Sequence, residues 1–292
     1  MRFTLRQLEV FLATAHHENI SLAAEELSMS QSAASSALKE LESQFDIQLF
    51  DRVGKRLQIN ELGQALRPQA QSLIDRAEDL QTQFSTHEIA GDLKVGATLT
   101  IGNYLAVQVM SQYKRQQPGA QVVLEVSNTA TIAGKVANYE LDIGLIEGEL
   151  QHSQLHVTSW RDDELCVFAA PGDPLCNKEQ LTDEDLLAAK WIIRERGSGT
   201  RQTFERAMAG LLADLQIELE LQHTEAIKRA VEAQLGIGCL SKVALKEAFA
   251  RGSLIPLAVP QRNFKRRFYF VLHKQKYISA GIQKWIELCR SL

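Results

Sequence analysis

The sequence of 292 residues is poor in cysteine, and its four cysteines, at positions 166, 176, 239 and 289, form no CxxC pair. Zinc ribbons and dithiol redox motifs need closely spaced cysteines, so the sequence excludes both and predicts no metal or other cofactor. Four scattered cysteines are typical of buried thiols in a reducing compartment. We therefore expect a cytoplasmic protein.

Long apolar runs and an excess of positive charge are also missing. No window holds 18 consecutive apolar residues, and the N-terminal MRFTLRQLEV carries charged or polar residues every few positions. These patterns predict neither a membrane span nor a signal peptide. The formal net charge of −4 excludes a uniformly basic nucleic-acid-binding coat but not a local basic patch.

The common catalytic motifs are absent too. The sequence contains no GxxxxGK[ST], no GxGxxG after a predicted strand and no GxSxG, and its seven histidines show no metal-ligand spacing. His223 lies beside Thr224 and Glu225, but no serine or aspartate partner for it can be identified. We therefore predict that the protein is not an enzyme.

The first ninety residues are predicted to be helical. Ser21 is the expected N-cap of a short second helix, and Ser30 is the expected N-cap of a third. At 100° per residue, the third helix carries one apolar stripe and an opposite face of small polar groups. The stripe is Ala34, Leu38, Leu41 and Phe45, and the polar face is Ser32, Ser35, Ser36, Lys39 and Ser43. Such a face suits close approach to a DNA groove, although an ordinary surface helix is the alternative.

Two features follow the third helix. The β-like pieces 48–50 and 56–59 flank Gly54 and predict a hairpin with three cations at its tip, Arg52, Lys55 and Arg56. From the predicted cap Asn60, a long helix carries Leu66, Ala70, Leu73, Ala77, Leu80 and Phe84 at heptad spacing. A seam of this length needs a partner helix, most simply one from a second copy of the chain.

The remaining two hundred residues alternate strands and helices, which predicts an α/β domain with largely parallel strands. The expected strands are 93–98, 122–126, 142–146, 164–170, 191–194, 218–221, 237–240 and 267–272. The expected helices are 102–117, 131–138, 183–188, 200–212, 225–234 and 280–289. A turn at Pro171–Leu175 is the expected place for a crossover between two subdomains.

The N-terminal motifs resemble those of the LysR-type transcriptional regulators. They are Leu5-Arg6-Gln7-Leu8, Phe11, Ser21, Ala23-Ala24, Leu27, Ser30-Gln31, Ser35, Leu41-Glu42, Leu49-Phe50-Asp51-Arg52 and Gly63. Within that family, GATLTIGNY, LDIGLIEGE, DELCVFAAP and WIIRERGSGTR resemble the branch of sulfite-responsive, sulfur-assimilation and carbon-fixation regulators. Two positions depart from the family pattern: Asp46 replaces the usual Gly after the recognition helix, and Asn60 replaces the usual Thr before the linker helix.

The resemblance implies an α/β protein in three parts. These are a winged helix-turn-helix domain at 1–60, a linker (dimerisation) helix at 61–89 and an effector-binding domain at 90–292. The last is expected to have two lobes, like periplasmic solute-binding proteins, with lobe I at about 90–162 and 268–292 and lobe II at about 163–267.

The resemblance further implies recognition of promoter half-sites in double-stranded DNA. The residues expected at base edges are Gln31, Ser32, Ser35 and Ser36, and those expected at phosphates are Thr4, Arg6, Lys39, Arg52, Lys55 and Arg56. Ser30, the expected cap of the recognition helix, is also expected among the DNA-binding residues. So few cations imply a homodimer or homotetramer that reads repeated half-sites. RNA polymerase is a further candidate partner.

Several Ser/Thr-rich segments lie where predicted strands end and helices begin. The carboxyl ends of strands in such domains converge on one crevice, and free N–H groups of helices there attract anions. The resemblance implies that Thr98, Thr100, Glu147 and the Arg194–Arg201 segment lie at the cleft between the lobes. Together with the Ser/Thr-rich segments, it gives the expected ligand residues Thr98, Thr100, Asn128, Glu147, Arg194, Glu195, Ser198, Gly199, Thr200, Arg201 and Thr224. Glu147 is expected either to pair with an arginine and orient it, or to select a protonated ligand.

The sequence thus predicts a ligand-responsive regulator that senses a small anion, either sulfite or sulfate or a small carboxylate. One alternative is a constitutive DNA-binding regulator whose C-terminal domain is structural and binds no ligand. Another is a redox sensor that uses Cys239, although no resolving cysteine is identifiable.

Overall fold

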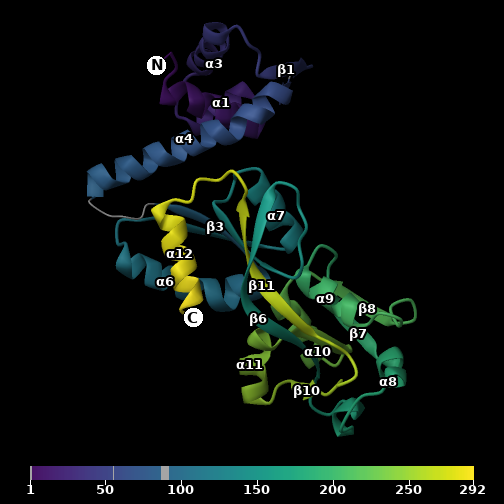
Figure 1. The fold of residues 1–292 in the computed structure, drawn as a ribbon. Coiled ribbons are helices and arrows are strands. Elements are labelled where there is room, and N and C mark those ends of the chain that lie inside the picture. Colours follow the sequence, from purple (N-terminus) through teal and green to yellow (C-terminus); the bar gives the residue numbers. More distant parts are fainter. Residues whose placement is uncertain (1, 55, 87–91) are drawn as a thin grey trace. The chain divides into compact units, whose positions relative to one another are not determined.

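The computed structural model describes residues 2–54, 56–86 and 92–292 and divides into two compact units (Figure 1). The first unit contains the chain up to Asp92 together with Gln117–Ala120 and Lys274–Lys284, and the second contains the rest. The boundary predicted near residues 87–91 lies outside the described residues. Within the described ranges, no helix is both long enough and apolar enough to cross a membrane.

The first unit begins with a helical domain and a short hairpin. Its elements are α1 (Leu5–His17), α2 (Ile20–Glu26), α3 (Gln31–Phe45), β1 (Phe50–Val53), β2 (Arg56–Ile59) and α4 (Glu61–Thr86). The predicted caps of α3 and α4 are confirmed, because Ser30 Oγ accepts from the Ala33 N–H at 3.2 Å and Asn60 Oδ1 from the Gly63 N–H at 2.9 Å. The predicted Ser21 cap was wrong. Asn19 Oδ1 accepts from the Ser21 N–H at 2.8 Å, so α2 begins one residue before Ser21.

The predicted apolar stripe of α3 packs into the core of this domain. Ala34, Leu38 and Leu41 are buried there against α1, whereas Phe45, at the end of the stripe, is 43% exposed. The opposite face of α3 is thereby directed to solvent. The core thus fixes which side of α3 is free for another molecule.

Asp46 ends α3 in the left-handed conformation, with φ +54°. A residue with a Cβ atom is strained in this conformation, whereas glycine is not. We predict that Asp46→Gly raises the free energy of unfolding of the first unit by roughly 0.5–1 kcal/mol, because the strain relieved exceeds the added freedom of the unfolded chain. Urea unfolding of the isolated variant would measure this. Asp51→Gly is the control. Asp51 lies in the extended strand β1, so its replacement by glycine should lower the free energy of unfolding. A lower free energy of unfolding in Asp46→Gly would contradict the prediction.

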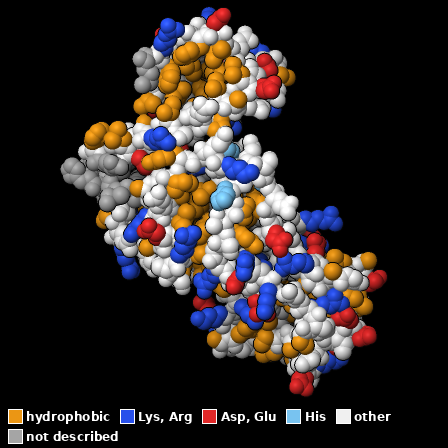
Figure 2. Space-filling model, in the orientation of Figure 1, with side chains coloured by type: hydrophobic (Ala, Val, Ile, Leu, Met, Phe, Trp, Pro, Cys, Tyr) orange, Lys and Arg blue, Asp and Glu red, His pale blue; other side chains and the backbone are white. Residues whose placement is uncertain are grey.

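Helix α4 divides its predicted heptad seam between two environments. Ala70 is buried in the core of the N-terminal domain and Leu66 packs against that core, so this part of the seam needs no second chain. Towards the C-terminal end of α4, Leu80 is 51% and Phe84 is 75% exposed. In Figure 2, hydrophobic side chains gather near that end of the helix. Leu73, between the two regions, is 45% exposed, so the seam from Leu73 onwards is available to a partner helix.

The second unit is built around one continuous sheet. Its strands are β3 (Leu93–Thr98), β4 (Val122–Ser127), β5 (Ile143–Glu147), β6 (Leu155–Ala169), β7 (Lys190–Arg194), β8 (Gln216–Leu221), β9 (Ile237–Ser241), β10 (Ile255–Leu257) and β11 (Lys265–His273). Their order is β4-β3-β5-β11-β6-β9-β7-β8, with β10 paired to β6. The groups β4-β3-β5 and β9-β7-β8 are parallel, as predicted, and define lobe I and lobe II.

Helices and single helical turns alternate with these strands. They are α5 (Leu99–Ile101), the π-helical η1 (Gly102–Ala106), α6 (Val107–Gln116), α7 (Thr129–Ala137), η2 (Pro174–Asn177), α8 (Asp183–Ala188), α9 (Gly199–Ala207), α10 (Thr224–Glu232), α11 (Lys242–Arg251) and α12 (Ala280–Arg290). In lobe II they cover both faces of the sheet. Trp191 and Ile193 of β7 pack with Phe204 of α9, whereas Ile192 packs with Ile227 of α10.

The chain crosses between the lobes close to the turn at Pro171–Leu175, near which a crossover was predicted. The crossing is made by β6, which ends at Ala169, and by β11, two long antiparallel strands that run through both lobes (Figure 1). Strand β6 begins at Leu155 rather than Glu164, and β10 and α11 were not predicted. The sequence concealed the first half of β6 because its many polar residues are half-buried or exposed. These two crossover strands set the carboxyl ends of β3, β5 and β7 facing one another.

Candidate functional site

The N-terminal half of α3 presents a small polar surface. Every residue predicted to read base edges or phosphates on this helix or its cap is exposed: Ser30, Gln31, Ser32, Ser35, Ser36 and Lys39. The Ser30 hydroxyl caps the helix and lies 3.1 Å from the Ser32 hydroxyl, so these two side chains are held in place. The surface has no bulky side chain that would keep a DNA groove at a distance.

The predicted phosphate contacts fall into two groups. Arg52 and Arg56 are exposed on the β1–β2 hairpin, while Lys55 lies outside the described residues. Arg6 and Thr4 have structural roles instead. The Arg6 guanidinium donates to Glu9 Oε2 at 2.7 Å and to the Leu27 carbonyl at 2.5 Å, and the Thr4 hydroxyl accepts from the Gln7 N–H at 3.2 Å and caps α1.

A buried carboxylate, that of Glu147, lies where the two lobes meet. Thr98 Oγ1 and the Thr100 N–H, both from lobe I, donate to Glu147 Oε1 at 2.9 and 2.8 Å. Thr200 Oγ1 of lobe II and Arg266 Nη1 of β11 donate to Oε2 at 2.9 and 2.8 Å. Two hydroxyls, one amide and one guanidinium thus surround both oxygens of a single carboxylate.

The electrostatics of this pocket keep Glu147 ionised. Burial by itself raises the pKa of Glu147, but the Arg266 guanidinium, the Thr100 N–H, the Arg194 charge and the Thr200 hydroxyl together lower that pKa to about 2. Glu147 therefore has no proton to give to a ligand at neutral pH, which disfavours selection of a protonated ligand. Of the two expected roles, pairing with an arginine is the one observed, and the arginine is Arg266.

This low pKa makes the second unit sensitive to acid. Because the folded pKa lies below that of an ordinary glutamate, the ionised group stabilises the fold above about pH 4.5, and this contribution is lost as pH falls towards 2. We predict a loss of roughly 3 kcal/mol across that range. Urea unfolding at a series of pH values would measure it, and Glu147→Gln should lack this component. An equally steep fall in Glu147→Gln would assign the acid sensitivity to other carboxylates.

Some of the other predicted ligand residues adjoin the pocket. Thr98, Thr100, Thr200 and Glu147 come together as expected. Gly199 lies so close to the Glu147 backbone that a Cβ there would be 1.9 Å from the Glu147 carbonyl oxygen. Thr224 is buried at the start of α10, and its hydroxyl has no hydrogen-bond partner within the described part of the chain.

The remaining predicted residues are engaged elsewhere. Asn128 and Ser198 cap α7 and α9 through their side chains. Arg194 forms a two-pronged pair with Glu195, at 2.7 and 2.9 Å. Arg201, expected to hold the anion, instead donates to Glu205 and Glu220 at 2.6 and 3.0 Å. Arg194 and Arg201, beside the Gly-Ser-Gly loop, are therefore paired with glutamates; Glu195 was itself an expected ligand residue, whereas Glu205 and Glu220 were not predicted as partners.

Arg266 is the functional candidate that the sequence analysis missed. Its guanidinium is 1% exposed and is shared between Glu147 Oε2 at 2.8 Å and Asp163 Oδ2 at 2.6 Å. The predicted strand began at Arg267, two residues after the observed start of β11 at Lys265, and so left Arg266 out. Arg266 continues the alternation of buried Phe268 and Phe270 on one face of β11, and an arginine in phase with buried residues was the available signal.

The thiols give no support to a redox sensor. Cys239 is buried, and burial raises the pKa of its thiol well above the usual value. Cys166 faces the other side of the sheet, with its pKa raised to about 11, again mainly by burial. Thiolates are the reactive form of cysteine, so both are inert at neutral pH.

Comparison with known proteins identifies both halves of the chain. The family described as "Bacterial regulatory helix-turn-helix protein, lysR family" matches residues 5–64, and the "LysR substrate binding domain" matches residues 86–292. The HTH-type transcriptional regulator YeiE of Escherichia coli (strain K12) is 39% identical over 289 residues, covering 99% of this chain and 98% of YeiE. CysL of Bacillus subtilis is 26% identical, with coverages of 90% and 89%, and the RuBisCO operon transcriptional regulator of Allochromatium vinosum is 29% identical, with coverages of 96% and 93%.

Solved structures agree in fold. A full-length OxyR variant from Pseudomonas aeruginosa has a TM-score of 0.73 at 21% identity and covers 99% of this chain and 98% of its own. The regulatory domain of CcmR from Synechocystis PCC6803, in complex with 2-PG, has a TM-score of 0.64 at 28% identity and covers 69% of this chain and 96% of its own. The fold class, the family and the branch named from the sequence are confirmed by these relatives, which are transcriptional regulators.

Proposed function

The chain belongs to the family of LysR-type transcriptional regulators, and we propose that it senses a small oxyanion in the pocket of Glu147 and transmits this signal to DNA bound by α3. We also propose the boundaries 1–60, 61–89 and 90–292 for its DNA-binding, linker and effector-binding parts. The observation that carries the proposal is the buried set of four donors around one carboxylate.

This donor set is chemically an oxyanion site. Hydroxyl, amide and guanidinium groups that converge at 2.8–2.9 Å bind sulfite, sulfate or a small carboxylate as readily as they bind the Glu147 side chain. The bound 2-PG of the CcmR regulatory domain is a small effector in a related protein. The hydroxyl of buried Thr224, which has no hydrogen-bond partner among the residues that the structure describes, supports a ligand that extends towards the start of α10.

Signalling requires two arrangements of the lobes that differ in ligand affinity. The pocket draws donors from both lobes, since Thr98 and Thr100 precede α6 while Thr200 lies in the first turn of α9. A free anion that displaces the Glu147 carboxylate would change the contact that joins the lobes. We propose that this change alters the spacing of the DNA-binding domains within an oligomer, and with it DNA bending or contact with RNA polymerase.

A second candidate function is favoured by the same carboxylate. Glu147 already satisfies the donors of the pocket, so the protein could be a constitutive regulator whose effector domain carries its own permanent anion. This candidate predicts no change in DNA footprint with any small anion. The two functions share the DNA-binding surface. They differ only in whether a free ligand can replace the Glu147 carboxylate in the pocket.

A thermal-shift screen with sulfite, sulfate, thiosulfate, phosphate and small carboxylates tests the proposal. A ligand at 100 times its dissociation constant stabilises the unit that binds it by about 2.7 kcal/mol. We expect one oxyanion to shift the melting temperature selectively and to change the DNase footprint of the full-length protein. The shift should be lost in Thr200→Val, which removes one donor, and kept in Arg201→Ala, since Arg201 donates elsewhere. No shift with any anion would favour the constitutive regulator.

The exposed end of α4 supports an oligomer, as expected for this family. We predict that Leu80→Glu combined with Phe84→Glu dissociates it, because two buried charges at a helix seam cost several kcal/mol. Sedimentation equilibrium would show the monomer mass, and affinity for a two-half-site DNA should fall at least about 100-fold with the loss of avidity. Gln64→Glu adds the same charge to the opposite side of α4 and should leave the mass unchanged. An intact oligomer in the double variant would assign dimerisation to another surface.

A further inference from the structure

Three side chains outside the Glu147 pocket join the lobes where η1 faces α10. The Tyr104 hydroxyl of η1 donates to Glu225 Oε1 at 2.6 Å, and Lys228 Nζ donates to the same hydroxyl at 3.1 Å. Lys228 Nζ also lies 2.5 Å from Glu225 Oε1. The three polar groups form a closed triangle between lobe I, which supplies Tyr104, and lobe II, which supplies the other two.

Lys228 is largely buried, unlike the lysine of an ordinary surface ion pair. Its side chain is 9% exposed, and its ammonium donates to a third acceptor, the Ala244 carbonyl, at 3.3 Å. The ammonium lies 5.6 Å from the centre of the Tyr104 ring, at cation–π distance. A buried ammonium is stable only while its acceptors remain in place, so movement of Tyr104 away from α10 leaves this charge undersatisfied.

The Tyr104 hydroxyl is suited to hold this contact. Burial and the hydrogen bond to Glu225 raise the pKa of Tyr104, so the hydroxyl keeps its proton and remains a donor. Tyr104 also lies in a π-helical turn, a geometry that often marks a functional position in a helix. That turn directly follows α5, whose Thr100 N–H donates to Glu147, so the triangle and the pocket share one helical segment.

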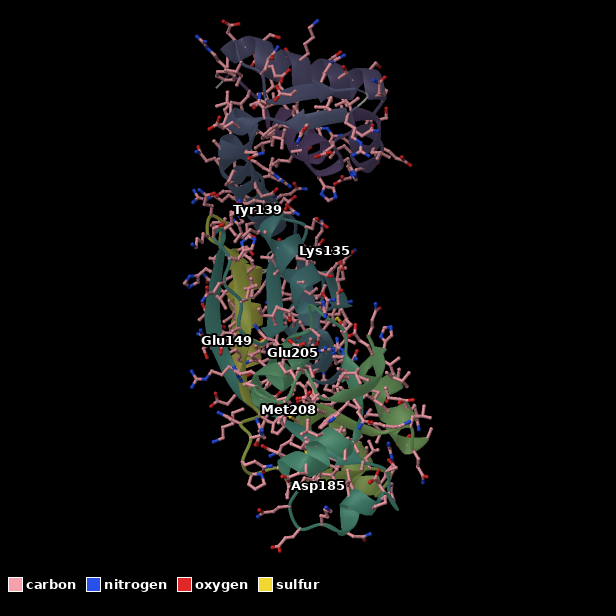
Figure 3. All side chains as sticks on the ribbon, turned by 90° about the vertical axis from the view of Figure 1, so that its right-hand side faces the viewer. Lys135, Tyr139, Glu149, Asp185, Glu205 and Met208 are labelled. Atoms are coloured by element: carbon pink, nitrogen blue, oxygen red, sulfur yellow. The ribbon has the colours of Figure 1, made fainter. Side chains whose placement is uncertain are left out.

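The lobes meet in a different way at α9. There, Gln202 accepts from the Glu149 N–H at 2.9 Å and donates to the Glu149 carbonyl at 3.1 Å. The backbones of Gly199 and Glu147 pack so closely that no side chain fits between them. Figure 3 shows Glu149 and Glu205 at the height where the lobes join, between Tyr139 of lobe I and Asp185 of lobe II. The α9 contact thus combines close backbone packing with the side chains of Thr200 and Gln202 and the Arg206–Glu149 ion pair, whereas the α10 contact depends on three side chains.

We propose that Tyr104, Glu225 and Lys228 form a clasp that controls how often the two lobes separate, and thereby controls access of an oxyanion to the Glu147 pocket. The second half of this statement rests on the proposed function, whereas the first does not. Lys228 and Tyr104 are positioning residues in this scheme, since they act on the pocket through the position of the lobes.

Hydrogen exchange without any ligand tests the clasp itself. The Ala130 and Glu149 N–H groups donate across the lobes to the Gly197 carbonyl and to Gln202 Oε1, so separation of the lobes frees both groups for exchange. We expect Tyr104→Phe to speed their exchange at least about tenfold, the effect of one charge-assisted hydrogen bond, and Lys228→Met to do the same. Arg229→Ala removes another ion pair of α10, that with Glu232, and should change neither rate. Unchanged exchange at Ala130 and Glu149, or changes confined to α10, would overturn the proposal.

Stopped-flow measurement of sulfite binding to the full-length protein tests whether the clasp controls access to the Glu147 pocket. Association should be about tenfold faster with Tyr104→Phe, in proportion to the more frequent opening. An unchanged association rate of sulfite with Tyr104→Phe would overturn the proposal that the clasp controls access to the pocket. If sulfite binds to neither protein while the two amides exchange faster, the pocket's proposed ligand is wrong and the clasp stands.

Discussion

Arg266→Met is expected to destabilise the second unit by about 3–5 kcal/mol, the usual cost of removing one partner from a buried ion pair. The guanidinium neutralises two carboxylates, Glu147 and Asp163, whose side chains are 1% and 3% exposed. Methionine fills a similar volume but leaves both negative charges buried near one another. For a domain of this size, the melting temperature of the unit should fall by about 10 °C.

The neighbouring arginine provides a matched control. Arg267 pairs with Asp162 at 2.8 Å, but its side chain is 59% exposed. Exposed ion pairs contribute at most about 1 kcal/mol, so Arg267→Met should leave the melting temperature nearly unchanged. Calorimetry on both variants makes the comparison, and equal melting temperatures would mean that the buried pair is not a stabilising element.

A double replacement separates charge from packing. Glu147→Met combined with Arg266→Met removes both members of the pair, so Asp163 alone, rather than two buried carboxylates, is left without the arginine. We expect the double variant to be more stable than Arg266→Met alone, because buried ion pairs can be replaced by apolar groups at little net cost. A simple sum of the two single losses would instead show that each residue stabilises the fold independently.

The sequence carried enough information for most of the fold because its elements have strong periods. Strand β3 and helix α8 were predicted with their observed bounds, and the apolar stripe of α3 was placed by angular arithmetic. The crossover strands were the main failure. The first half of β6 shows no clean alternation, since its outer residues are polar and only partly covered, and the ladder with β11 that stabilises it is a contact distant in sequence.

The same reason explains what was found and missed in the site. Thr98, Thr100 and Thr200 lie at strand–helix junctions, where local sequence signals the position of a crevice. Arg266 reaches the pocket only because β11 pairs with β5 and β6. This pairing places it beside Glu147, a residue 119 positions earlier in the chain. Arg201 differs, because one of its two glutamate partners, Glu205, lies one turn later on the same helix and was readable from the sequence. Only the other partner, Glu220 on β8, is a more distant contact.

Glu147→Ala is expected to turn the pocket into a high-affinity site for free oxyanions. The substitution leaves the Thr98 and Thr200 hydroxyls, the Thr100 N–H and the Arg266 guanidinium without the carboxylate that now satisfies them. Buried donors without acceptors are costly, so the variant should unfold more easily than the parent in anion-free buffer. Acetate, which restores the missing carboxylate as a free molecule, should raise its stability by about 2.7 kcal/mol at 100 times its dissociation constant.

The comparison of this variant with the parent protein then decides between the two candidate functions. In the parent, any ligand competes with a carboxylate tethered at high effective concentration, so its affinity for sulfite should be at least about 100-fold weaker than that of Glu147→Ala. If the parent still binds sulfite, titration calorimetry will give the dissociation constants of the parent and of Glu147→Ala, and the regulator is a sensor. If only the variant binds, Glu147 is a permanent occupant and the regulator is constitutive. Glu149→Ala removes an exposed glutamate two residues away and should show no rescue by acetate; rescue there, or none in Glu147→Ala, would mean that the four donors do not form an anion site.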